Sequence, residues 1–191
     1  MATPGKIIII SAPSGSGKST IIRELTDTHH VPLTFSVSAT NRPPRTGETD
    51  GVHYHFLSDE AFRSAIAADE FVEYEEVYPG RFYGTLKSEV ERRSAAGENV
   101  LLDIDVKGGC RVKEMYADGA LSIFIMPPGI DELRRRLEGR ATDPQDAIEA
   151  RLSKAAYEME FAPRYDAVVV NDDLATASAE VARLITDFIA K

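Results

Sequence analysis

The chain has 191 residues, 43% of them hydrophobic, and a formal net charge of -9. This length predicts one compact domain, with room for small inserted lobes. The acidic balance disfavours nucleic acid or an anionic membrane as a broad partner, since both require a basic face. It is compatible with nucleotides, because a few well-placed cations can hold phosphate groups in an acidic protein.

Short apolar runs alternate with helical patterns along the chain. Residues 7–10 are four isoleucines, which is typical of a strand buried on both faces. Further strands are predicted at 33–37, 100–102, 121–126 and 167–170, and helices at 20–26, 59–68, 86–96, 130–138, 144–160 and 176–190. Strands that alternate with helices predict an α/β fold with a parallel sheet flanked by helices on both faces.

Two segments fit this core poorly. Residues 38–83 are polar, rich in glycine, proline and aromatics, and alternate near 52–56, which indicates a small lobe with antiparallel strands of its own. Residues 129–163 are mostly helical and arginine-rich, without a buried strand. We therefore predict two insertions in one core. The predicted core comprises 1–37, 86–128 and 164–191, and the insertions comprise 38–85 and 129–163.

A glycine-rich loop follows the isoleucine strand and precedes the first helix. Its residues, with the next one in the helix, are Ala12, Pro13, Ser14, Gly15, Ser16, Gly17, Lys18, Ser19 and Thr20. Such a loop points successive backbone N–H groups at one anion, and the helix adds its positive end. Lys18 suits the β- and γ-phosphates of a nucleoside triphosphate, and the Ser19 hydroxyl suits Mg²⁺. The consensus begins with glycine, where this chain has Ala12; the flanking strand and helix favour a phosphate-binding loop over a surface turn.

A succession of motifs follows the loop. These are FSVSATNRPPRTGE at 35–48, GVHYHF at 51–56, FVE at 71–73, YGT at 83–85, LDID at 102–105, RLEGR at 136–140 and VNDDL at 170–174. In this order and spacing, nearly the whole chain resembles guanylate kinase. The chain departs from the family at Lys107, where glutamine is usual, and over 74–82, which is one residue longer than in some members.

The resemblance implies an activity and an architecture. Guanylate kinases transfer the γ-phosphate of ATP to GMP, and we expect the same for dGMP, with Mg²⁺ bound to the ATP. The fold implied is the P-loop nucleoside-monophosphate-kinase fold, in which 38–85 is the GMP-binding lobe and 129–163 is a helical lid.

Guanine recognition is assigned through the same resemblance. Guanine presents two adjacent donors, N1–H and the 2-amino group, and an acceptor at O6. Glu73, Asp105 and Ser38 resemble the family residues that pair with these groups, and Thr85 resembles a further hydroxyl that contacts guanine. Adenine would leave buried carboxylate oxygens unpaired, and sites of this kind discriminate by roughly 10⁴ or more.

The GMP phosphate requires a clamp of its own. Arg42 and Arg45 flank two prolines, which hold the segment extended. Arginine suits bidentate phosphate binding. Tyr54 and Tyr83 resemble the family tyrosines that donate hydroxyls to the same phosphate. A solvated basic turn is the alternative for the two arginines taken alone.

Polar residues follow two of the predicted strands. Asp103 and Asp105 end the apolar run 100–102, and the carboxyl end of a parallel strand lies beside the ligand crevice. We expect Asp103 to face Mg²⁺ or its waters; capping the turn at 108–109 is the open alternative. Asn171 follows the last strand and is expected near the adenine, with a turn-forming role as the alternative.

The second insertion carries the arginines expected to act in catalysis. Arg136, Arg140 and Arg151 align with the family's lid arginines, which stabilise the charge of phosphoryl transfer and exclude water. Ordinary helix-surface charge is the alternative, and we accept it for Arg134 and Arg135.

Three other functions fit the sequence less well. A kinase for AMP, UMP or dTMP would need another base pocket than Glu73 and Asp105 form. Guanylate-kinase-like scaffold domains bind phosphopeptides and typically have damaged phosphate loops, whereas Lys18 and Ser19 are intact here. A P-loop GTPase would need an Asn-Lys-x-Asp motif, which this chain lacks.

The remaining expectations concern location and partners. The single cysteine, Cys110, allows no disulfide within the chain and fits a reducing compartment. The apolar run near the start is too short for a signal peptide or a membrane span, so we expect a cytoplasmic protein. Apart from ATP and GMP we expect no nucleic-acid or membrane partner, and the sequence does not indicate an oligomeric state.

Overall fold

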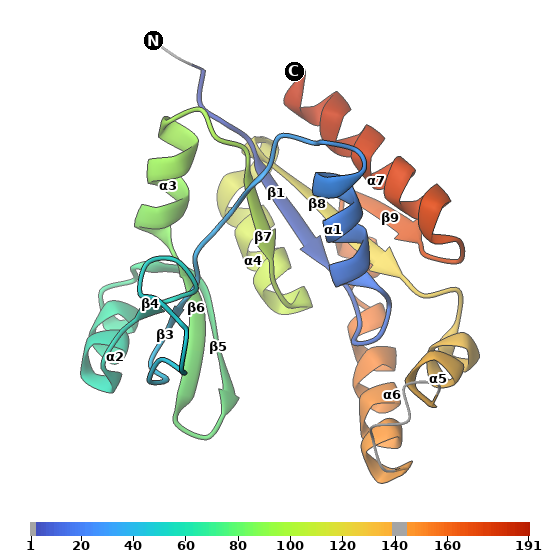
Figure 1. The fold of residues 1–191 in the computed structure, drawn as a ribbon, viewed down its shortest axis with the longest axis horizontal. Coiled ribbons are helices and arrows are strands. Elements are labelled where there is room, and N and C mark those ends of the chain that lie inside the picture. Colours follow the sequence, from blue (N-terminus) through green and yellow to red (C-terminus); the bar gives the residue numbers. More distant parts are fainter. Residues whose placement is uncertain (1–2, 139–144) are drawn as a thin grey trace.

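A computed structural model describes residues 3–138 and 145–191. At its centre lies a five-stranded sheet in the order β2-β7-β1-β8-β9, of which Figure 1 labels β7, β1, β8 and β9. All of its neighbouring strands are parallel, as predicted. The strands are β1 (Ile7–Ser11), β2 (Thr34–Phe35), β7 (Val100–Asp103), β8 (Ala120–Met126) and β9 (Ala167–Val170).

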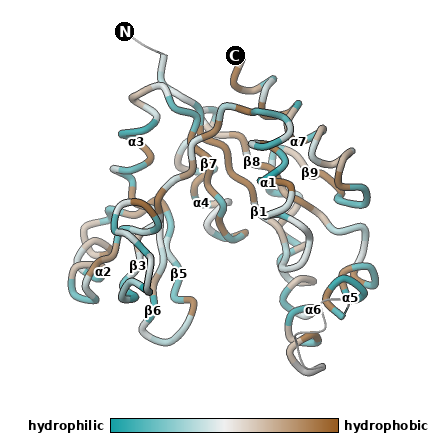
Figure 2. The backbone as a smooth tube through the Cα atoms, viewed as in Figure 1, coloured by the Kyte–Doolittle hydropathy of each residue, from teal (hydrophilic) through white to brown (hydrophobic). Residues whose placement is uncertain are grey.

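The isoleucines of β1 explain why this sheet is covered on both faces. Ile7 and Ile9 pack on one face of the sheet, and Ile8 and Ile10 pack on the other. Since every side chain of the strand is buried, each face requires its own layer of helices. The tube in Figure 2 is accordingly brown along the central strands. One layer contains α1 (Lys18–Asp27) and α7 (Leu174–Ile189), and the other contains α3 (Lys87–Ala95) and α4 (Val106–Tyr116).

Helix α4 was not predicted. Its start is capped by Asp105, whose carboxylate accepts hydrogen bonds from the N–H groups of Lys107 at 2.7 Å and Gly108 at 3.1 Å. The neighbouring glycines lower helix propensity and obscure the helical pattern. The fold requires at least Gly109, because a Cβ there would lie 2.2 Å from the Tyr165 hydroxyl oxygen. The residue that caps the turn at 108–109 is therefore Asp105 and not Asp103.

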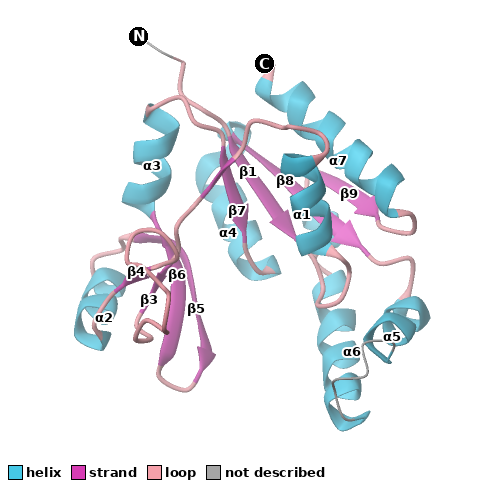
Figure 3. Cartoon of the chain, viewed as in Figure 1, coloured by secondary structure: helices cyan, strands magenta, loops and turns pink. Residues whose placement is uncertain are grey.

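A second, four-stranded sheet is built from the first inserted segment, in the order β4-β3-β6-β5 (Figure 3). Strands β3 and β5 each pair antiparallel with β6, as expected for this lobe. The expectation of antiparallel pairing is wrong for β4, which runs parallel to β3. The intervening chain turns twice at glycines with positive φ, Gly47 and Gly51, and so returns in the same direction. The elements are β3 (Ala39–Thr40), β4 (His55–Phe56), α2 (Asp59–Ala67), β5 (Phe71–Tyr78) and β6 (Arg81–Leu86).

This lobe has an aromatic core of its own. The Phe62 ring is fully buried and stacks on Phe71, with centroids 4.5 Å apart, and on Phe82, with centroids 5.6 Å apart. Helix α2 thereby packs onto the second sheet without using the central core, which explains how an insertion this small remains ordered.

The second inserted segment forms a pair of helices, α5 (Ile130–Glu138) and α6 (Gln145–Met159). They pack together through the buried side chains of Leu133, Leu137, Ile148 and Leu152. In Figure 1 this pair and the lobe of the second sheet lie on either side of the edge where the central strands end. Short 3₁₀ turns at Ala117–Gly119 and Ala162–Arg164 complete the described elements. Within 3–138 and 145–191, no helix has both the length and the apolarity needed to cross a bilayer.

Candidate active site

The loop between β1 and α1 has the geometry of an anion cradle. Gly15 and Gly17 adopt φ angles of 89° and 90°, which side chains other than hydrogen rarely allow. Residues 12–15 and 17–20 line a cavity that 103–105 and Glu158 complete. Ser16 does not line this cavity, because its buried hydroxyl donates to the Pro13 carbonyl oxygen at 2.8 Å. Helix α1 begins at Lys18, so its positive end faces the cavity.

Lys18 and Asp103 meet in this cavity. The Lys18 ammonium lies 2.5 Å from a carboxylate oxygen of Asp103. Ser19 lines the same space, so a hydroxyl and a carboxylate, both oxygen ligands that suit Mg²⁺, are available together. Over the described ranges no three His, Cys, Asp or Glu residues group as a metal site.

Asn171 supports the loop from beneath. Its side chain is buried, and its amide nitrogen donates to the Ser16 carbonyl oxygen at 2.7 Å. A Cβ at Gly17 would lie only 2.4 Å from that nitrogen, so glycine is required there by both backbone angle and space. The contact of Asn171 with adenine stays a prediction, whereas its contact with the loop is present.

A second cavity adjoins the first. Ser38, Tyr54, Glu73 and Tyr83 line it, and so do residues 103–105, which it shares with the phosphate-loop cavity. The carboxyl end of β7 is thus the common wall of two cavities, one lined by the glycine-rich loop and one by the lobe. Two ligands bound there would face each other across Asp103 and Asp105.

Carboxylates dominate the second cavity. Glu73 is only 6% exposed, and the Thr85 hydroxyl donates to it at 2.7 Å. Burial raises the pKa of Glu73 to about 7, and the nearby charge of Asp105 adds to this. Thr85 is itself buried and contacts Glu73. Glu75, which was not predicted, lines the same cavity, and its pKa is raised by burial and by Asp105. The period of two along β5 could have indicated it, because alternate strand residues share a face.

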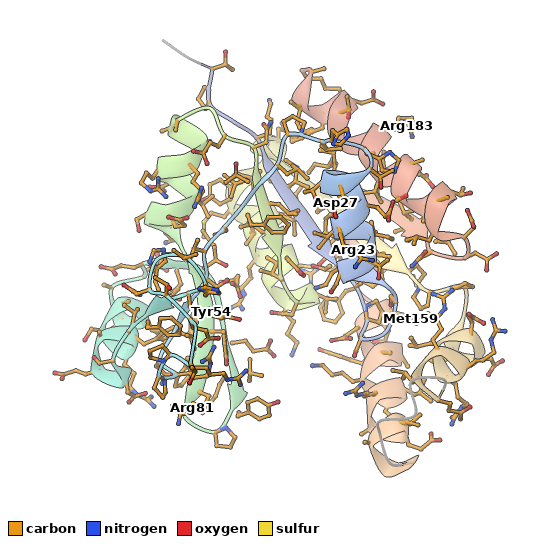
Figure 4. All side chains as sticks on the ribbon, in the orientation of Figure 1. Arg23, Asp27, Tyr54, Arg81, Met159 and Arg183 are labelled. Atoms are coloured by element: carbon orange, nitrogen blue, oxygen red, sulfur yellow. The ribbon has the colours of Figure 1, made fainter. Side chains whose placement is uncertain are left out.

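The predicted phosphate clamp is partly assembled. Both terminal nitrogens of Arg42 bind Glu48, at 2.7 and 2.8 Å, and its Nε donates to the Tyr83 hydroxyl at 3.3 Å. The Arg42 guanidinium also lies 5.3 Å from the centre of the Tyr54 ring (Tyr54 is labelled in Figure 4). Arg45 is exposed, and its backbone N–H donates to Glu48 at 2.6 Å.

Glu48 was quoted in the sequence motif without a role. Its contacts with Arg42 and Arg45 hold the pKa of the Glu48 carboxyl down, to about 2, with the Arg42 hydrogen bond as the largest cause. It therefore stays ionised at any ordinary pH and orients Arg42 in the absence of a phosphate.

The predicted lid arginines lie in different surroundings. Arg136 donates to Glu132 at 2.8 Å and to the Asn171 carbonyl oxygen at 3.0 Å, so α5 is joined to the residue that supports the loop. Arg151 is half-buried on α6. Arg140 lies outside the described residues. Arg134 and Arg135 pair with Glu149 and Glu132, which agrees with a surface role for both.

Two features define a P-loop phosphotransferase. One is the glycine-rich loop at the end of a parallel strand, and the other is the second cavity, which shares a wall with the cavity of that loop at the end of β7. A family model described as guanylate kinase matches residues 4–188. The guanylate kinase of Bacteroides fragilis is 58% identical over 184 residues, which cover 96% of this chain and 90% of that protein. That of Porphyromonas gingivalis is 52% identical over 186 residues, covering 97% of this chain and 99% of the relative.

A solved structure agrees with these relatives. The crystal structure of guanylate kinase from Anaplasma phagocytophilum matches with a TM-score of 0.72 at 31% identity, covering 100% of this chain and 89% of the other. The chain belongs to the guanylate kinase family. This confirms the resemblance and the fold class that the motifs predicted.

Proposed function

We propose that this chain transfers the γ-phosphate of Mg²⁺-ATP to GMP, and to dGMP, releasing ADP and the nucleoside diphosphate. The junction of the two cavities at residues 103–105 is the observation that carries this proposal. A triphosphate on the glycine-rich loop and a monophosphate held by the lobe would bring their phosphates together at that wall. Such proximity converts a reaction between two molecules into one within a single complex.

On the ATP side, residues 12–20 surround the phosphates, which accept from the loop N–H groups that are not already bonded within the protein, and Lys18 leaves Asp103 to neutralise the β- and γ-phosphates. Ser19 and Asp103 would hold Mg²⁺, directly or through water. The ion supplies charge neutralisation of the phosphate oxygens. Asn171 keeps the loop in shape through Ser16, and we propose that it also approaches the adenine.

On the GMP side, ionised Glu73 accepts hydrogen bonds from the two guanine donors, and Asp105 and Ser38 complete recognition of the base. Thr85 contributes by holding Glu73 in orientation, as well as through any contact of its own. Arg42, Arg45, Tyr54 and Tyr83 bind the phosphate. Arg42 can do so while keeping Glu48, because a guanidinium has five donors.

The lobe and the helix pair have separate tasks in this proposal. Residues 38–85 bind GMP, and 129–163 form a lid over the core made of 1–37, 86–128 and 164–191. Closure of the lid brings Arg136, Arg140 and Arg151 to the transferring phosphoryl group, where the three arginines stabilise the negative charge that is spread over the phosphoryl oxygens. The same closure excludes water from the site. We place the reaction in the cytoplasm, which the single buried Cys110 supports.

A nucleotide panel tests the reaction. The purified chain is assayed with Mg²⁺-ATP and GMP, AMP, UMP or dTMP, with ADP formation coupled to NADH oxidation. Turnover with GMP alone, lost in Lys18→Ala, is the expected result. Equal turnover with AMP or UMP would refute guanine recognition, and no GDP from GMP would favour the scaffold alternative. If Arg151→Ala and Arg140→Ala both kept the wild-type kcat, the lid assignment would be wrong.

A further inference from the structure

Glu158 is a buried carboxylate for which the mechanism above has no use. It lies in the last turn of α6, is 7% exposed, and lines the phosphate-loop cavity. Its Oε2 atom is buried and has no hydrogen-bond partner among the residues that the structure describes. Figure 4 labels its neighbour Met159 near the end of α6 that lies beside the loop.

This arrangement is unfavourable for the protein without nucleotide. A buried carboxylate oxygen that lacks a donor loses hydration without compensation, and such groups are rare in folded proteins. Burial accordingly raises the pKa of Glu158. The charges around it are Lys154, 3.7 Å away on the same helix, Lys18 on the loop and the opposing carboxylate Asp105. An apolar side chain would suit the fold better, so the carboxylate indicates a functional demand.

Glu158 lies where the lid helix meets the phosphate-loop cavity. Ser14 and Glu158 line the same cavity, and the Ser14 N–H lowers the pKa of Glu158, against the effect of burial. On α6, Arg151 precedes it by seven residues, which is two turns, or about 10 Å, along the same side of the helix. This side flanks the apolar side through which Ile148 and Leu152 pack on α5. Any shift of Glu158 against the loop is therefore transmitted along a rigid helix to Arg151.

We propose that Glu158 is a positioning residue that couples occupancy of the phosphate loop to the lid, a role that rests on the proposed function. Beside Ser14, it fixes the end of α6 against the loop. Its Oε2 accepts a hydrogen bond from a donor that enters with the hydrated triphosphate. The lid helix is then held where Arg151 reaches the transferring phosphoryl group only when ATP is bound.

The test compares Glu158→Gln and Glu158→Ala with Glu160→Gln, a matched control at an exposed position two residues later. We expect kcat to fall about 10- to 100-fold in both Glu158 variants, since small misplacements of catalytic groups cost this much. The KM for GMP should stay within threefold of wild type, because the guanine cavity is not changed. The ratio of ATP hydrolysis to GDP formation should rise, since a misplaced lid admits water. The control should match wild type in all three.

Thermal melting separates this role from a purely structural one. Without nucleotide, both Glu158 variants should melt at or above the wild-type temperature, because a buried charge has been removed. The rise in melting temperature on adding a non-hydrolysable Mg²⁺-ATP analogue should be smaller in the variants than in wild type. A kcat within twofold of wild type, or a loss of activity matched by a lower melting temperature, would overturn the proposal.

The same experiment distinguishes failure of the proposed function from failure of the Glu158 coupling. If the wild type made no GDP from GMP, the reaction assignment would fail, while the analogue-induced melting shift would still test Glu158. An equal shift in wild type and in both variants would then refute the coupling by itself.

Discussion

Replacing Glu73 with glutamine should lower kcat/KM for GMP and, at the same time, raise the free energy of unfolding. The variant keeps the size of the side chain and leaves one oxygen for the Thr85 hydroxyl, which donates to Oε1 at 2.7 Å. One guanine donor would then face an amide NH₂ group in place of a carboxylate oxygen. An unpaired buried donor costs about 2–3 kcal/mol. This corresponds to a loss of roughly 30- to 150-fold in kcat/KM for GMP.

The gain in stability follows from the raised pKa of Glu73. Burial shifts that pKa from its ordinary value of 4.5 to about 7. The folded protein thus binds the proton more tightly than the unfolded chain, so wild-type stability falls as the pH rises from 4.5 to 7 and is constant above it. The shift corresponds to about 3 kcal/mol. Glutamine carries no charge, so Glu73→Gln should recover up to this amount at pH 8 and almost none at pH 4.

Urea denaturation at pH 4 to 8 measures the stability difference, and the coupled assay measures kcat/KM. Glu70→Gln, at an exposed position on the approach to β5, is the matched control and should change neither quantity. The reasoning is refuted if Glu73→Gln is less stable than wild type at pH 8, or if its kcat/KM for GMP stays within threefold of wild type.

Three further changes test other parts of the structure. Glu48→Gln removes the charge that orients Arg42, so the KM for GMP should rise about tenfold in steady-state assays. The rise should be the same from pH 5 to pH 9, because the pKa of Glu48 is about 2. A rise in KM that appears only at high pH would contradict this. Asn171→Asp puts an acceptor against the Ser16 carbonyl oxygen, so the melting temperature should fall, with a stability loss of about 2–3 kcal/mol. Calorimetry should show weaker ATP binding, and unchanged ATP binding would refute the support of the loop by Asn171. Phe62→Ala should cost about 3–5 kcal/mol in urea denaturation, and a loss under 1 kcal/mol would show that the lobe does not depend on its aromatic core.

Local pattern predicted most of the elements. The helix expected at 130–138 and the strand expected at 167–170 have the bounds observed for α5 and β9. The first segment has strong helical periodicity and the second contains three consecutive valines, so neighbouring residues suffice to specify them. Helix α4 was missed because its glycines obscure the helical pattern, although Gly109 is needed for packing against Tyr165, a residue from a distant part of the chain. The direction of β4 was wrong because alternation reveals a strand but not its partner.

The residues of the site also fall into those with a local sequence signal and those without one. The loop at 12–19 could be identified from the sequence, since its glycines, Lys18 and Ser19 are contiguous and flanked by a strand and a helix. Glu73 and Arg42 could be singled out only through family motifs, because an isolated glutamate or arginine carries no local signal. Glu75 and Glu158 were missed, since their importance comes from the cavities they line.

The glycine-rich loop shows both what local sequence determines and what it leaves to the tertiary structure. Its amino acids by themselves determine that it can cradle phosphate, because backbone freedom at Gly15 and Gly17 and the start of a helix are local properties. Only the tertiary structure decided what surrounds it. Asn171 lies beneath it, 155 residues from Ser16, the Asp103 carboxylate lies beside Lys18, and Glu158 lines its cavity from α6. Contacts of this kind depend on how the sheet brings distant segments together, and no pattern of neighbouring residues encodes them.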